Sequence, residues 1–282
     1  MGIFEFFNKK NKKKDDVNLT ENNVKTDKKL GDWFQPRIDG GVLELVYNHN
    51  IKDGVFVVPQ EAISIESCAF EGCDNLETLV LHKGITFIAP NAFNNCKNLK
   101  KIVGLSELTE MNNFGGFSGC TGLERVCLPE TIEVINVSAF WGCTNLNCVY
   151  VPPTCLMIEP YAFNNCASLH YLEIPSTIKF IKEEAFKGCH NLTLMFSDEL
   201  VDDKQDSNLV KNSFDITIAQ GALNDVKTVC AHDIKIIEKV IESGYRGVVS
   251  YFDEKNNQVI TVDLATIEKI CKDGQDFGKE KE

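Results

Sequence analysis

The residues best suited to metal or redox chemistry in this 282-residue chain are its twelve cysteines and five histidines. Cys68 and Cys73 stand five positions apart and His82 follows, which would suit half of a zinc site. Zinc sites usually combine two closely spaced pairs of ligands. Cys143 and Cys148 have the same spacing, but they occupy a different position in the pattern described below. We therefore predict no metal site.

Other signatures of catalysis or cofactor binding are also missing from the sequence. It has no phosphate loop, no dinucleotide-binding glycine pattern and no Gly-x-Ser-x-Gly elbow. The tripeptide Asp-Phe-Gly occurs within residues 275–278, but no other kinase motif accompanies it. The chain is therefore predicted not to be an enzyme and to need no cofactor.

Six cysteines instead mark one position of an internal repeat. Segments such as "AFEGCDNLETLVL", "AFWGCTNLNCVYV" and "AFKGCHNLTLMFS" recur with their cysteines 23, 24, 23, 23 and 23 residues apart. A reduced cysteine acts as a small apolar side chain, so we expect this column to pack in the interior. The six are Cys73, Cys96, Cys120, Cys143, Cys166 and Cys189.

Four further columns of apolar residues accompany the cysteines. One repeat is too short to bury them alone, but stacked repeats merge them into a continuous core. The columns are Phe70, Phe93, Phe117, Phe140, Phe163 and Phe186; Leu76, Leu99, Leu123, Leu146, Leu169 and Leu192; Leu79, Ile102, Val126, Val149, Leu172 and Met195; and Ile65, Ile88, Met111, Ile135, Ile158 and Ile181.

The elements that position these columns follow from the residues around each cysteine. The preceding residue is always Gly or Asn, the two types that most readily adopt a left-handed conformation. This predicts a short helical turn over "AFxG", closed by that residue. A strand such as "LETLVL" follows, and a second, weaker strand is expected over segments such as "IKFI". Equivalent strands of successive repeats must be parallel.

The pattern "IPSTIKFIKEEAFKGCHNL" at 174–192 resembles the BspA-type leucine-rich repeat family. The resemblance implies a right-handed, curved α/β repeat solenoid with short helical turns and a parallel sheet on its concave face. Members of that family are commonly surface proteins that bind other proteins. The expected function is thus that of a protein-interaction scaffold with a protein partner.

Five segments are expected along the chain. Residues 1–30 form a Lys- and Asn-rich disordered tail, and 31–59 form an N-terminal β cap in which "GVLELVYN" and "GVFVVP" pair. Six repeats occupy 60–196, and an acidic linker covers 197–212. Residues 213–282 form a small α+β cap or an independent module, with a helix over "DIKIIEKVIESGY", a hairpin turning at Asn256–Asn257 and a final helix "TIEKICKD".

Charge and hydropathy limit the partners and the location. A net charge of −12 argues against nucleic acid, which requires a basic surface. No secretory signal or membrane-spanning stretch is recognisable, so a cytoplasmic protein is expected. Aromatic residues at 4, 6 and 7 precede lysines at 9, 10, 12, 13 and 14, so this tail either touches anionic lipid or is simply solvated.

The predicted binding surface consists of outward side chains on the concave sheet. The alternative is that these side chains only satisfy strand propensity or are covered by flanking segments. Two other functions stay open: a surface adhesin exported by an unrecognised route, and a small-ligand or enzymatic site in the C-terminal module. The predicted contact residues are Arg125, Tyr150 and Tyr171 at the centre, with Lys101, Val103, Glu173, Thr78 and Val80 around them.

Overall fold

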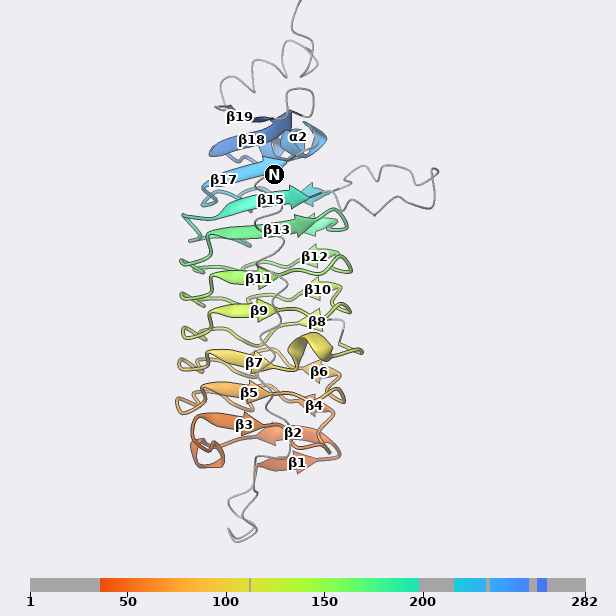
Figure 1. Ribbon diagram of the computed structural model, residues 1–282, viewed down its shortest axis with the longest axis vertical. Coiled ribbons are helices and arrows are strands. Elements are labelled where there is room, and N and C mark those ends of the chain that lie inside the picture. Colours follow the sequence, from red (N-terminus) through yellow and green to blue (C-terminus); the bar gives the residue numbers. More distant parts are fainter. Residues whose placement is uncertain (1–35, 112, 198–215, 232–233, 254–257, 263–282) are drawn as a thin grey trace, which may run out of the picture. The chain divides into compact units, whose positions relative to one another are not determined.

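The structure, a computed structural model, describes residues 36–111, 113–197, 216–231, 234–253 and 258–262. The expected tail over 1–30, almost all of the expected linker and the expected final helix lie outside these residues. The described residues from 36 onward form a parallel β-solenoid of about eight turns with few helices (Figure 1). The predicted repeat solenoid is thereby confirmed at this level.

Each turn of the solenoid contributes a strand to what we call the front sheet. The front strands are β3 (Val55–Val57), β5 (Thr78–Val80), β7 (Lys101–Val103), β9 (Arg125–Cys127), β11 (Cys148–Tyr150), β13 (Tyr171–Pro175), β15 (Thr193–Ser197), β17 (Thr228–Ala231) and β18 (Val248–Asp253). The strands are hydrogen-bonded in three parallel groups, β3 to β7, β9 to β11 and β13 to β18, and successive groups contact each other. The antiparallel strand β19 (Gln258–Val262) ends the series beside β18.

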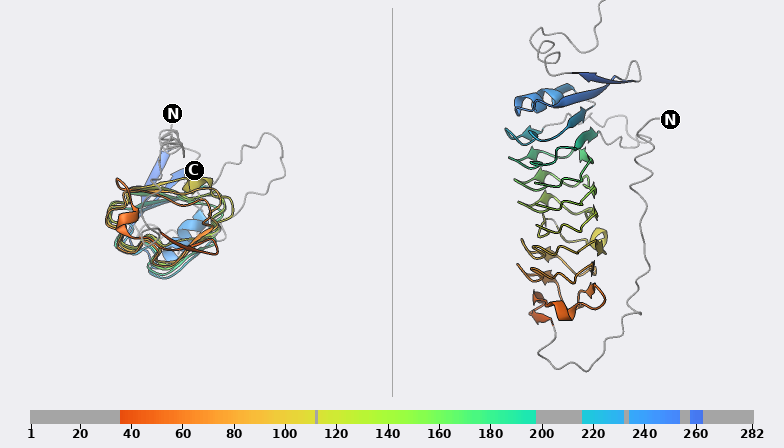
Figure 2. Two further views of the ribbon diagram at one scale, coloured as in Figure 1. Left: turned by 90° about the horizontal axis from the view of Figure 1, so that it is seen from below. Right: turned by 90° about the vertical axis from the view of Figure 1, so that its left-hand side faces the viewer.

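A second strand from each turn forms what we call the back sheet. The antiparallel strand β1 (Arg37–Asp39) precedes it, and the 3-10 helix η4 (Leu105–Glu107) lies where its two parallel blocks separate. Figure 2 shows the turns stacked along one direction. The back strands are β2 (Val42–Leu45), β4 (Ser64–Ile65), β6 (Phe87–Ile88), β8 (Asn113–Phe114), β10 (Val134–Ile135), β12 (Met157–Ile158), β14 (Phe180–Ile181) and β16 (Thr217–Ile218).

The space between the sheets holds the predicted columns. All six Phe and all six Leu of the first two columns are fully buried, which confirms those assignments. The Phe rings stack from turn to turn, with centroids 4.6 Å apart for Phe70 and Phe93 and 5.5 Å apart for Phe163 and Phe186. Each turn thus contributes one buried aromatic ring to a continuous stack along the solenoid.

The assignment of Met111 to the inward column of the back sheet is wrong. Phe114 occupies that position, because it is the residue paired with Ile135 of β10. The additional chain length of the third repeat lies before β8 and includes η4. Met111 is also buried, but it lies before the strand.

The assignment of Met195 to the inward column of the front sheet is also wrong. Leu194 pairs with Leu172, so one residue fewer separates Cys189 from the inward position than in the other repeats. Leu194 and Phe196 are fully buried, whereas Met195 is only partly buried. A shift of one residue moves every side chain of a strand to the opposite face.

The segments between the back and front sheets are tight turns closed by left-handed residues. The predicted left-handed column is confirmed, with φ between +59° and +78° at Gly72, Asn95, Gly119, Gly142, Asn165 and Gly188. A second left-handed column was not predicted and includes Cys68, Asn91, Ser138, Tyr161 and Glu184. Successive i→i−3 bonds, such as Cys73 N–H to Phe70 O at 3.0 Å, form these turns.

The two runs expected to pair before the repeats do not pair with each other. β2 joins the back sheet beside β4, and β3 joins the front sheet beside β5. The 3-10 helix η3 (Asn48–Asn50) connects them. Each run pairs with the next turn instead, because these residues already follow the path of a repeat.

The C-terminal described residues extend both sheets. β16 pairs with β14, β17 pairs with β15, and the helix α2 (Ile234–Glu242) contacts β16 and β17. β18 and β19 pair around residues 254–257, whose own turn lies outside the described residues. The division of the chain into caps, repeats and module stays a prediction.

Candidate protein-binding surface

The predicted contact residues lie in two outward columns of the front sheet. The residues on either side of each inward residue point to the opposite face of the sheet. Backbone pairing aligns Thr78 with Lys101 and Val80 with Val103. The structure exposes Arg125, Tyr150 and Glu173, and it leaves Thr78, Val80, Lys101, Val103 and Tyr171 partly buried.

The centre of this surface lies on β9 and β11. Arg125 is aligned with Cys148, and Cys127 with Tyr150, so the four side chains form a compact group. The Tyr150 hydroxyl donates a hydrogen bond to Glu130 Oε1 at 2.9 Å. This bond holds the phenol in one orientation while 38% of Tyr150 stays exposed.

Tyr171 differs from Tyr150 in its surroundings. Its pKa is raised above the ordinary value, mainly because burial disfavours the charged phenolate and secondarily because Glu173 carries a like charge. Tyr171 therefore contributes more packing, and less free contact surface, than its sequence position suggested.

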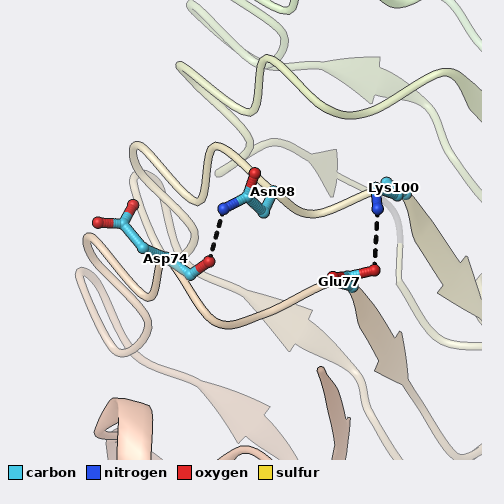
Figure 3. Close-up of polar contacts among 4 residues, drawn as sticks. All are labelled: Asp74, Glu77, Asn98 and Lys100. Atoms are coloured by element: carbon cyan, nitrogen blue, oxygen red, sulfur yellow. Dashed lines mark hydrogen bonds and ion pairs between the residues drawn. The ribbon is translucent and has the colours of Figure 1, made fainter. Parts of the chain in front are cut away.

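One edge of the surface is formed by the turns that lead into β5 and β7 (Figure 3). Asn98 Nδ2 donates to the backbone oxygen of Asp74 at 2.8 Å. Lys100 Nζ and Glu77 Oε2 form an ion pair at 2.9 Å. Both charged side chains are more than half exposed, so the pair contributes at most about 1 kcal/mol to stability. The pair joins the starts of two neighbouring strands.

The column cysteines are buried, which confirms their predicted packing role. Each thiol also donates to a backbone oxygen of the preceding turn, such as Cys96 Sγ to Phe70 O at 2.9 Å and Cys143 Sγ to Phe117 O at 3.1 Å. Burial raises the pKa of Cys96 and of Cys143 to about 12. Such thiols are not nucleophilic at neutral pH. Cys127 is exposed, as its outward position predicted.

An acidic hollow lies beside the irregular third repeat. It has a volume of about 470 Å³ and is open to solvent. Nothing in the sequence pattern pointed to it beyond the extra residue of that repeat. Throughout the described ranges, no group of three or more His, Cys, Asp or Glu is arranged to hold a metal ion. The lining residues are Thr109, Glu110, Glu130, Thr131, Glu133, Thr154 and Leu156.

Large exposed apolar side chains gather around the back sheet and its turns, where we had predicted no site. Val137 is 56% exposed and Trp141 is 46% exposed. The available signal was the column that precedes each inward back-strand residue, because it is apolar in several repeats. The other exposed apolar residues of this region are Ile63, Phe87, Leu156, Tyr161 and Phe180.

In the part of the chain that the structure describes, no helix has both the length and the apolar character needed to cross a bilayer.

The chain is similar to leucine-rich repeat proteins of known structure. A leucine-rich repeat protein of T. pallidum has a TM-score of 0.57 and 21% identity, with 77% of this chain and 96% of that chain covered. A leucine-rich repeat protein of Bacteroides ovatus has a TM-score of 0.46 and 20% identity, with coverages of 68% and 54%. The first likeness shows a shared fold.

No curated protein matches the sequence significantly. The family model described as "BspA type Leucine rich repeat region" matches residues 63–193 in six copies. The match covers the same six cysteine-marked turns that the sequence revealed. The repeat region of this chain, residues 63–193, therefore matches the BspA-type leucine-rich repeat family.

Proposed function

We propose that this protein is a non-enzymatic scaffold that binds a protein partner on the front sheet. The observation that carries the proposal is the exposure of Arg125 on β9 and of Tyr150, which lies diagonally across from it on the neighbouring strand β11. Tyr and Arg are the residue types most often found at the energetic centre of protein interfaces. Support also comes from the family, in which protein interaction and surface association are common.

A rigid presentation of these side chains is the proposed mechanism. The strands that carry them are hydrogen-bonded in register, and Tyr150 is held by Glu130. Binding to such a surface costs less conformational entropy than binding to side chains that must first become ordered. Glu173 on β13 adds an acidic contact next to the apolar and basic centre.

The test is affinity purification from the native host, with proteins identified by mass spectrometry. The bait is the full chain, compared with the double variant Arg125→Ala/Tyr150→Ala. Loss of two such contacts is expected to weaken binding by at least about 30-fold, since one hot-spot residue contributes about 2 kcal/mol or more. Tyr171 is left unchanged because its partial burial would mix stability with binding.

A matched control replaces exposed residues of similar type away from the centre, as in Tyr47→Ala/Lys52→Ala. This control should retain the partner, and both double variants should melt within a few degrees of the wild type. Undiminished binding by Arg125→Ala/Tyr150→Ala would place the partner elsewhere and overturn the proposed site. The cytoplasmic location stays a prediction, and detection of the protein on intact cells by antibody would favour the adhesin alternative.

A further inference from the structure

The back sheet carries an apolar strip flanked by opposite charges. Its centre is the turn that carries β12, where Leu156, just before the strand, is 41% exposed and Met157 on the strand is partly buried. Val134 on β10 and Phe180 on β14 lie beside Met157 in parallel register. Figure 1 shows β10 and β12 on consecutive turns of the solenoid, and β14 pairs with β12 on the next turn.

The charges of the strip are arranged in the same register. The acidic Glu133 precedes Val134, and the basic Lys179 precedes Phe180. Both charged side chains are exposed. The backbone oxygen of Glu133 accepts from Leu156 N–H at 2.8 Å, and the backbone oxygen of Leu156 accepts from Lys179 N–H at 2.7 Å. The acidic, apolar and basic residues therefore follow one another directly across three turns.

This order is self-complementary under a two-fold rotation. An axis that runs along β12 between two copies reverses the order of the turns but keeps positions along the strands. It places β10 of one copy opposite β14 of the other, as an isologous interface requires. Glu133 then faces Lys179 of the second copy, the reciprocal pair forms at the same time, and Val134 faces Phe180.

We propose that the back sheet is a self-association surface, and that two copies of this chain pair through β10, β12 and β14 with Glu133 opposite Lys179. The basic side includes Lys182, whose Nζ lies 4.9 Å from the ring centroid of Phe180. The pairing uses the opposite sheet from the proposed partner site, so a dimer would present two front sheets.

The size of the strip predicts a weak dimer. The three strands β10, β12 and β14 span about 10–15 Å at the usual strand spacing of about 4.8 Å. A contact of that size falls below the usual range of specific interfaces, so only weak association is expected. Sedimentation velocity of the full chain from about 1 to 300 µM is suited to detecting it.

Charge reversal tests the geometry. Glu133→Lys and Lys179→Glu should each weaken self-association at least about tenfold, because each creates two like-charge contacts. An equimolar mixture of the two variants should regain dimers, since both charge pairs are then opposite again. The double variant Glu133→Lys/Lys179→Glu should likewise dimerise as the wild type does.

Controls with the same charge changes are available on the turns that lead into the front sheet. Lys97→Glu and Glu124→Lys are exposed and should leave the association unchanged. Circular dichroism confirms that each variant is folded. A chain that stays monomeric to about 300 µM overturns the proposal, as does a dimer that ignores the reversals or a mixture that stays monomeric. A monomer would instead point to a different protein as the occupant of this strip.

Discussion

Replacement of Phe140 by Ala should strongly destabilise the fold. Phe140 is fully buried, and its ring stacks on Phe163 at 5.3 Å and on Phe114 at 5.2 Å between centroids. A buried Phe→Ala change costs about 3–5 kcal/mol through lost transfer energy and the resulting cavity. Ring pairs add about 0.5–1.5 kcal/mol each. We therefore expect a cost near the upper end, about 4–5 kcal/mol.

The next residue in the chain provides the matched control. Trp141 is a larger aromatic residue, but 46% of it is exposed. Trp141→Ala should cost less, about 2 kcal/mol, because only about half of its surface leaves water on folding. Phe140→Leu should fall between the two, since it keeps much of the side-chain volume.

The assay is urea unfolding followed by far-ultraviolet circular dichroism, at a concentration too low for self-association. The free energy follows from the midpoint and the slope of the transition. A smaller slope in a variant would show that the solenoid no longer unfolds as one unit. In that case the variants are ranked by their urea midpoints. The reasoning is refuted if Phe140→Ala is no more damaging than Trp141→Ala, or if Phe140→Leu is as damaging as Phe140→Ala.

Two further predictions concern the column cysteines and the left-handed turns. Burial raises the pKa of the Cys143 thiol from 9.0 to about 12. The stability contributed by the protonated thiol is therefore complete below pH 9 and is lost as the pH rises towards 12. The urea midpoint of the wild type should fall above pH 9, and that of Cys143→Ala should fall less steeply; a midpoint that does not change with pH would contradict this. Gly142→Ala should cost about 1–2 kcal/mol because φ is +72° and the added carbon meets no atom closer than 3.9 Å. Gly188→Ala should cost more, since its added carbon would clash with the Asn165 side chain and lie 3.1 Å from the Asn165 Cα atom. Equal melting temperatures for the two variants would count against this account.

Much of the fold was predictable because corresponding residues of successive repeats occupy the same structural position. Once Cys73 and Cys96 are aligned, their neighbours must take the same backbone path, so the buried Phe and Leu columns and the left-handed residue before each cysteine follow together. The errors occurred where equivalence breaks. Phe114 replaces Met111 after an insertion, and Leu194 replaces Met195 after the loss of one residue.

The candidate surfaces were less predictable because exposure depends on neighbouring turns. Tyr150 and Tyr171 occupy outward positions of adjacent strands, yet Tyr150 is exposed and Tyr171 is partly buried. The alignment of Glu133 with Lys179 arises from the pairing of β10, β12 and β14, which single-repeat patterns do not reveal.

The sequence alone determined the repeat length, the inward columns and the parallel stacking, because each depends on residue types that recur at a fixed interval. Only the tertiary structure decided the strand register at Phe114 and Leu194, since a one-residue slip exchanges the two faces of a strand. It also decided which outward side chains stay accessible, because that depends on the turns above and below. The back-sheet strip around Met157 belongs to this second class.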